Sequence, residues 1–199
     1  MQKISFFKDA HALSDIEVIQ QIRWWHTDAF ELIYERYNKP LYNYIWTLLN
    51  FNTEEAGMVL SDVFIEAFTY IQNKDIDNLK SLLYRMAHNS SIDRIRKNEN
   101  QKEWLPEETE NYADHHDIQR KEKIDTGYKR KLMHTYLSKM DEKYRSVLYL
   151  VYYEDKSYDE IAIIQNSNKN SIGTLAFQGK KKLEDLMKHA GIDPNIFLL

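Results

Sequence analysis

Apolar side chains recur at steps of three and four residues through most of the chain, the period of an α-helix with one buried face. In the N-terminal half this pattern predicts helices over residues 13–22, 28–48, 53–71 and 79–97, with a polar loop at 72–78. Pro40 falls inside the second helix. Because proline lacks a backbone N–H, we expect Pro40 to mark a kink or the first turn of a further helix.

Two helix starts stand out in the C-terminal part. Ser157 and Glu160 have the spacing of a capping box, and Asn168 is a good N-cap residue. They predict a short helix, a turn, and a second helix whose apolar residues form one buried stripe at helical period. The members of that stripe are Ile172, Ala176, Gly179, Leu183 and Leu186. This is the pattern of a helix-turn-helix.

Two further segments complete the C-terminal part. Residues 128–140 are predicted to form its first helix. Residues 147–153 are rich in residues that favour strands. They lie between helical segments with no partner strand nearby, so we predict a core helix there as well.

The composition supports an all-α fold. Only five Gly and three Pro occur among 199 residues, too few for the tight turns of a β-sandwich, while 43% hydrophobic residues argue against disorder. The absence of Cys excludes disulfides, thiolate catalysis and Cys-ligated zinc. No apolar run is long enough to span a bilayer and no signal-like segment is present. We therefore expect a soluble, cytoplasmic protein without a membrane partner.

Charge divides the chain more sharply than its net value of −4 suggests. Residues 98–127 carry nine acidic side chains against four basic ones, with weak apolar periodicity, and are predicted to be a linker. Residues 79–97 carry five Lys or Arg against the single acid Asp93, which makes the last N-terminal helix a basic patch. The predicted boundaries are therefore 1–97, 98–127 and 128–199.

Three ordered blocks resemble the extracytoplasmic-function (ECF) sigma factors, initiation subunits of bacterial RNA polymerase. Asp28 to Tyr37 (DAFELIYERY) resembles the opening helix of region 2, and Leu82 to Lys97 (LLYRMAHNSSIDRIRK) its promoter-melting part. Asp141 to Arg145 (DEKYR) and Ser157 to Ala162 (SYDEIA) resemble region 4. The resemblance implies two small helical domains, region 2-like and region 4-like, joined by the acidic linker.

The same resemblance implies core RNA polymerase and promoter DNA as partners. An anti-sigma factor or a DNA-targeting partner protein is a further candidate. Nothing points to a cofactor, a metal or an enzyme, because the chain has no glycine-rich phosphate loop, no nucleophile elbow and no zinc-binding His pair.

The basic helix and the loop before it are the predicted contacts to the −10 element. Charge alone would favour an ordinary solvated helix; the resemblance favours contact with the separating strands, where cations follow the backbone and polar groups hold a freed base. The candidates are Asn73, Lys74, Asn78, Lys80, Arg85, His88, Asn89, Arg94, Arg96 and Lys97.

The helix before that loop corresponds to the surface by which the family contacts the polymerase clamp. Only one acid of the family's usual set, Asp62, is present. Neighbouring apolar residues are either anchors for a partner groove or ordinary core. The candidates are Val59, Leu60, Asp62 and Ile65.

The second helix of the helix-turn-helix should read the −35 element, yet its outer face is short of basic residues. The candidates for DNA or partner contact there are Asn170, Ser171, Thr174, Phe177, Gln178 and Lys181. Two interpretations stay open: a divergent −35 preference, or placement delegated to a DNA-bound activator or an RNA-guided DNA-binding protein.

Two other functions also stay open. One is a stand-alone helix-turn-helix regulator that never binds polymerase. The other is a scaffold that binds polymerase or a sigma regulator without starting transcription.

Overall fold

The computed structural model describes residues 13–24, 26–102 and 132–193, and within these ranges the chain is helical with no strand. The N-terminal unit contains α2 (Asp15–Arg23), the short 3-10 helix η1 (Thr27–Ala29), α3 (Phe30–Leu48), α4 (Thr53–Asn73) and α5 (Leu79–Lys102). The C-terminal unit contains a helical segment at 132–137, then α7 (Glu142–Tyr152), α8 (Tyr158–Ile164) and α9 (Lys169–His189). The predicted all-α fold is confirmed.

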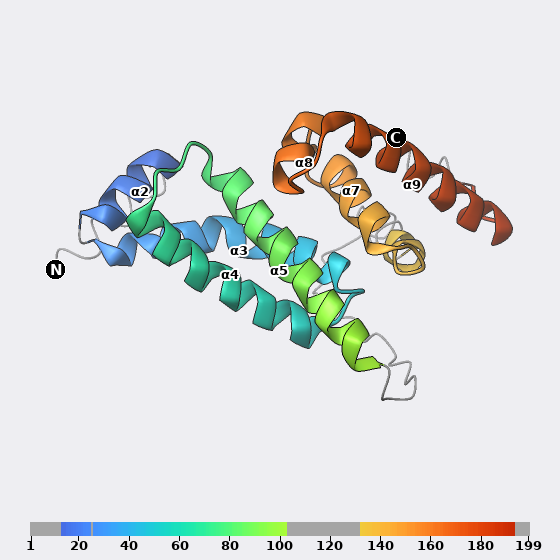
Figure 1. Cartoon of the computed structure of the whole chain (residues 1–199), viewed down its shortest axis with the longest axis horizontal. Coiled ribbons are helices and arrows are strands. Elements are labelled where there is room, and N and C mark those ends of the chain that lie inside the picture. The colour runs from blue at the N-terminus through green and yellow to red at the C-terminus, as the bar shows by residue number, and fades with distance from the viewer. Residues whose placement is uncertain (1–12, 25, 103–131, 194–199) are drawn as a thin grey trace, which may run out of the picture.

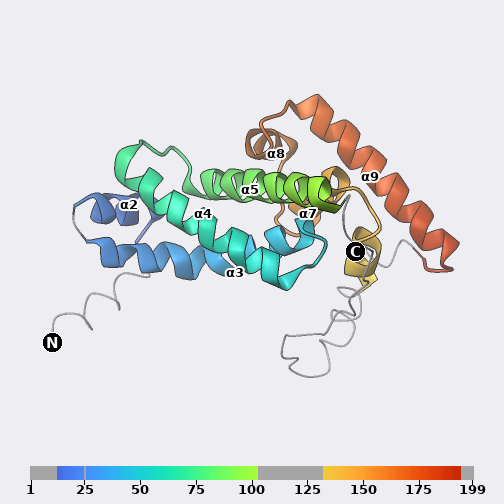
Figure 2. The ribbon, with the colours of Figure 1, turned by 60° about the horizontal axis from the view of Figure 1, so that its bottom comes forward.

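In the N-terminal unit α3, α4 and α5 run side by side and α2 crosses one end (Figures 1 and 2). Ile33, Leu41 and Ile45 of α3 are fully buried in its core. Pro40 lies within the continuous helix α3, so no new helix begins at this residue. Helix α5 continues five residues past the predicted boundary at 97, while most of the predicted linker lies outside the described residues.

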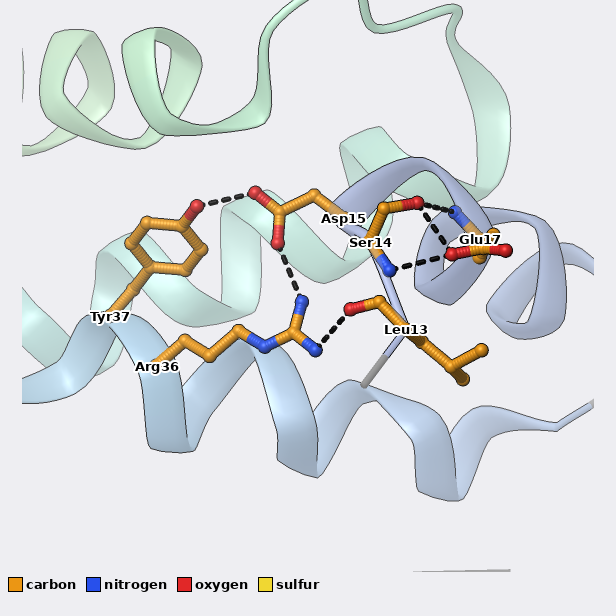
Figure 3. Close-up of polar contacts among 6 residues, drawn as sticks. All are labelled: Leu13, Ser14, Asp15, Glu17, Arg36 and Tyr37. Atoms are coloured by element: carbon orange, nitrogen blue, oxygen red, sulfur yellow. Dashed lines mark hydrogen bonds and ion pairs between the residues drawn. The ribbon is translucent and has the colours of Figure 1, made fainter. Parts of the chain in front are cut away.

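Polar contacts fix α2 against α3 (Figure 3). Ser14 caps α2: its side chain accepts from the Glu17 backbone N–H, and the Glu17 carboxylate accepts from the Ser14 N–H at 2.7 Å. Asp15 accepts hydrogen bonds from Tyr37 and, at 2.8 Å, from Arg36. The first four backbone N–H groups of a helix have no partner within the helix, so side chains such as Ser14 stabilise its start.

The C-terminal unit contains the predicted helix-turn-helix. Ser157 and Glu160 form the capping box of α8, and the Asn168 side chain accepts from the Ser171 N–H at 2.9 Å to cap α9. Hydrogen bonds from Lys156 and Ser157 lower the pKa of Glu160 to about 2, so the carboxylate stays charged. The strand-like residues 147–152 lie in α7, because Val147, Leu148 and Leu150 pack in a helical core.

The two units pack directly on each other. Helix α7 lies against α3, and α8 lies against α5. The turn between α3 and α4 adds a third contact: Phe51 is 4% exposed and packs among residues of the C-terminal unit, including Leu137, Met140 and Leu148. The main hydrophobic core therefore draws on side chains from both units.

Candidate nucleic-acid interface

Helix α5 and the loop before it carry the −10 candidates, and Arg23 of α2 holds that loop. Its guanidinium donates to the carbonyl oxygens of Ile71, at 2.8 Å, and Lys74, and lies 3.2 Å from the Asp75 carboxylate. The sequence pattern gave no sign of this role, because Arg23 is 48 residues or more from its partners.

The loop candidates differ in what their side chains already do. The Asn78 side chain accepts from the Ser81 N–H at 2.8 Å and so caps the start of α5. Asn73 donates to the Thr69 carbonyl at 2.7 Å. Lys74 is exposed. Of the three, only Lys74 carries a positive charge, and it is exposed to solvent.

His88 is placed differently from the prediction. Its Nδ1 atom lies 3.0 Å from the Tyr44 hydroxyl and 3.4 Å from the Ser146 hydroxyl, at the contact between the two units. Burial lowers its pKa to about 4, so His88 is neutral at pH 7. The imidazole therefore faces protein hydroxyl groups. In this structure it does not face DNA as predicted.

Two cations of α5 are also already paired. Lys80 lies 3.7 Å from the Glu154 carboxylate of the C-terminal unit, whose side chain is 11% exposed. Arg94 donates to Glu55 of α4, and this hydrogen bond raises the pKa of the Arg94 guanidinium. Both residues therefore stabilise packing in this structure.

The remaining candidates of α5 face solvent. Asn89, Arg96 and Lys97 are exposed, and Arg85 is half-buried. The Arg96 guanidinium lies 3.7 Å from the carboxylate of Asp93, three residues earlier on the same helix. The basic surface available to a nucleic acid thus lies mainly in the second half of the helix.

On α4 the four polymerase candidates divide between core and surface. Val59 is 4% exposed and packs in the main core, so its prediction as a contact residue is wrong: a buried side chain cannot reach a partner. Leu60 is half-buried against the same core. Asp62 is exposed and Ile65 is 68% exposed, and Met58 adds a further exposed apolar side chain.

On α9 the outer face is open. Asn170, Thr174, Phe177, Gln178 and Lys181 are exposed, and Ser171 is half-buried. Phe177 is 72% exposed, an unusual position for a phenylalanine. Gln178 is held by the unit itself, because the Tyr144 hydroxyl donates to its side-chain oxygen at 3.2 Å. The open face therefore presents one aromatic ring with small polar groups and Lys181 around it.

Some of the lysines near this face are already paired with acidic side chains of the protein. Lys169 pairs with Asp159 at 2.6 Å, and Lys182 lies 3.6 Å from Asp141 and over the Tyr144 ring. Phosphate contacts usually need unpaired Lys or Arg, so this helix offers few of them.

Comparisons with known proteins agree with this geometry. Residues 130–183, which contain the helix-turn-helix, match the family described as "Sigma-70, region 4". The chain is 29% identical over 179 residues to the ECF RNA polymerase sigma factor SigW of Bacillus subtilis, covering 85% of this chain and 95% of SigW. It is 24% identical over 160 residues to the ECF RNA polymerase sigma factor SigM of the same organism, covering 77% and 92%.

A solved structure has the same fold. CnrH, in complex with the cytosolic domain of CnrY, superposes with a TM-score of 0.64 at 17% identity, over 88% of this chain and 97% of CnrH. This likeness shows that the two proteins share a fold. Over most of its length the chain is similar to ECF sigma factors. None of the described helices is long and apolar enough to cross a membrane.

Proposed function

We propose that this chain binds core RNA polymerase and starts transcription at promoters that its two units help to locate and open. One observation supports this most strongly: the region 4 match coincides with α8 and α9, while the relatives SigW and SigM match the chain over most of its length, both units included. A run-off transcription assay with core polymerase tests the proposal. Absence of a transcript together with retained polymerase binding would favour a scaffold; absence of binding would favour a stand-alone regulator.

The exposed side of α4 is the proposed polymerase contact. Asp62 supplies charge, while Met58 and Ile65 supply exposed apolar surface next to it. Asp62→Arg with Ile65→Glu alters this surface without touching the core, so co-purification with core polymerase should be lost while the circular dichroism spectrum is kept. Ile16→Glu on α2 is the matched control, because Ile16 is also exposed, at 60%. Equal co-purification of both variants would contradict this contact.

The second half of α5 is the proposed contact to the opened −10 region. Arg96 and Lys97 are exposed, and removing both should lower open-complex formation without lowering polymerase binding. Each lost phosphate contact to single-stranded DNA should reduce the salt slope by about 0.7. Permanganate footprinting measures the bubble. An unchanged bubble at equal salt would contradict the assignment.

Placement at the −35 element is proposed to be delegated to a partner protein. Phe177 is an exposed aromatic side chain where a base-reading cation would be expected, and such rings commonly anchor protein contacts. A DNA-bound activator or an RNA-guided DNA-binding protein would supply the missing specificity. CnrH, which shares the fold, is seen with a protein domain bound. An anti-sigma factor is therefore a further partner to consider for this chain.

Selection from randomised −35 DNA distinguishes delegation from a divergent preference. Under delegation, holoenzyme alone should recover no sharp motif. Recovery of a sharp motif that Asn170→Ala abolishes would instead show direct reading by α9, since Asn contacts adenine edges.

A further inference from the structure

Helix α2 lies beside the C-terminal end of α4 and the loop that follows it (Figures 1 and 2). Arg23, the last residue of α2, brings its guanidinium to this point: Nε donates to the Ile71 carbonyl at 2.8 Å, and Nη2 donates to the Lys74 carbonyl. The third nitrogen, Nη1, lies 3.2 Å from the Asp75 carboxylate. All three nitrogens of the guanidinium therefore have partners between Ile71 and Asp75.

The end of α4 needs a cation that its own sequence does not supply. The last four carbonyl groups of a helix lack partners within it and carry partial negative charge. Helix α4 has no basic residue in its last turn, so Arg23 supplies the cation from another helix. A lysine could supply the charge, but not the planar fork that binds two carbonyls and a carboxylate at once.

The second half of the loop, residues 76–78, is fixed by other contacts. Ile76 is half-buried and packs on the main core, and the Asn78 side chain accepts from the Ser81 N–H at 2.8 Å. Arg23 fixes the first half, because it holds the backbone where α4 ends. The exposed side chains between these fixed points are Lys74, Asp75 and Asp77.

Two neighbouring side chains of this loop carry opposite charges. Lys74 can attract a phosphate, whereas the fully exposed Asp75 carboxylate repels it, and the Arg23 guanidinium offsets that negative charge. Residues 72–78 contain no aromatic ring, so selection of a base there depends on hydrogen bonds. Hydrogen bonds weaken steeply when their geometry departs from the optimum, so the loop must be held in one shape.

We propose that Arg23 is a positioning residue for base selection in the −10 region. Its fork fixes the backbone at Ile71 and Lys74, so that the loop meets a freed base in one shape, and its charge offsets Asp75. The inference rests on the proposed function, because it places this loop against the opened DNA that α5 is proposed to contact. The two roles are separable: shape depends on the bonds to the carbonyls, and charge depends on the pair with Asp75.

The role in shape is tested with Arg23→Lys, which keeps the charge but loses the fork, and with Arg23→Gln, which loses both. Holoenzyme selects transcribed templates from a promoter library whose −10 region is randomised. Both variants should lower the preference for the favoured base at one position by about tenfold, within the discrimination that a good base contact supplies. Co-purification with core polymerase and the circular dichroism spectrum should stay as in wild type.

Arg36→Gln is the matched control. Arg36 also binds a backbone carbonyl and a carboxylate, those of Leu13 at 2.5 Å and Asp15 at 2.8 Å, but at the other end of α2. Its loss removes the same kind of contact without touching the loop. The −10 preference of this variant should equal that of wild type.

The role in charge is tested by adding Asp75→Asn to Arg23→Gln. Arg23→Gln alone leaves the Asp75 carboxylate without its counter-charge, so holoenzyme should bind a single-stranded −10 oligonucleotide more weakly, by about fivefold at low salt, where screening is weak. The double variant should recover this affinity, measured by fluorescence anisotropy, but not the base preference. A general loss of folding would not separate the two readouts in this way.

The outcomes separate this inference from the proposed function. Full base preference in Arg23→Lys would show that the fork is not needed, and an equal loss in Arg36→Gln would show a general effect on stability; either result overturns the positioning role. Failure of Asp75→Asn to restore affinity overturns the role in charge. Wild type that transcribes without any −10 preference overturns the inference and leaves the proposed function standing. Wild type that gives no transcript contradicts both.

Discussion

The two helices with predicted nucleic-acid contacts, α5 and α9, differ in how much of their polar surface is already engaged. Helix α5 is rich in cations, yet Lys80 and Arg94 are paired with Glu154 and Glu55. Helix α9 is poor in cations on its outer face, yet Phe177 and Asn170 there are exposed. Whether a side chain is available to a nucleic acid therefore depends on what covers or pairs with it. The charge content along the sequence does not reveal this.

Loss of Tyr44 should have the largest effect on stability, because its fully buried ring packs between Tyr84 of α5 and Tyr149 of α7. Tyr44→Ala should lower the free energy of unfolding by about 3–5 kcal/mol, as for other large aromatic truncations in a core. Tyr44→Phe keeps the ring but loses the hydrogen bond to Ser146, and should cost about 1 kcal/mol.

Urea unfolding measures both Tyr44 variants. Tyr152→Ala is the control, since Tyr152 is 45% exposed on the same unit that Tyr44 contacts. Equal losses for Tyr44→Ala and Tyr152→Ala would show that the contact between the units contributes little to stability.

His88 makes the stability of the contact between α5 and the C-terminal unit depend on pH. Its pKa is lowered to about 4, so between 4 and its ordinary value the unfolded chain binds more protons than the folded one. Stability from this group is therefore fully present above its ordinary pKa and is lost as the pH falls toward 4. At pH 5 the loss relative to pH 7.5 should be about 2 kcal/mol.

His88→Gln isolates this pH effect, because Gln does not titrate and can still hydrogen-bond to the hydroxyls of Tyr44 and Ser146. The difference in unfolding free energy between pH 7.5 and pH 5 should be smaller in the variant than in wild type by that amount. The other titratable groups are the same in both proteins, so the comparison isolates His88. An identical pH dependence in both would contradict the buried position of His88.

Much of the fold could be predicted from local patterns, whereas the docking of the units could not. The capping boxes at Ser14 and Ser157 act over three residues, so the sequence shows them directly. The hydrogen bond from Tyr44 to Ser146 joins residues 102 apart and leaves no periodic trace. His88, a polar residue in a basic helix, carries no signal that distinguishes a buried network from a solvated face.

The buried position of Val59 could be predicted from the sequence pattern. Val59 follows Ala56 by three residues and precedes Val63 by four, and all three are buried on one face of α4. Helical period alone therefore assigns Val59 to the core. The family resemblance leaves the apolar residues of this segment open between partner anchors and core, and the helical period decides between them.

Adding one cation to the outer face of α9 should increase its affinity for DNA. Thr174 is exposed on the outer face, so Thr174→Arg supplies the kind of contact that this face lacks. Holoenzyme binding to duplex DNA should tighten by roughly tenfold at low salt, and the salt slope should rise by about 0.9 if one phosphate is contacted. Thr135→Arg adds the same charge to an exposed position outside α9. Equal effects of both variants, measured by fluorescence anisotropy, would show only a general charge effect.

The smallest expected effect comes from the two glycines of α9, Gly173 and Gly179. A Cβ at Gly173 would lie 3.6 Å from the Tyr158 ring, an ordinary contact, so Gly173→Ala should stabilise the protein by about 0.5–1 kcal/mol through helix propensity. A Cβ at Gly179 would lie 3.3 Å from Leu148 and 3.4 Å from Tyr144, so crowding should cancel or reverse that gain. Thermal unfolding of the two variants measures the difference. A gain at Gly179 equal to that at Gly173 would show that α9 packs on α7 more loosely than the structure indicates.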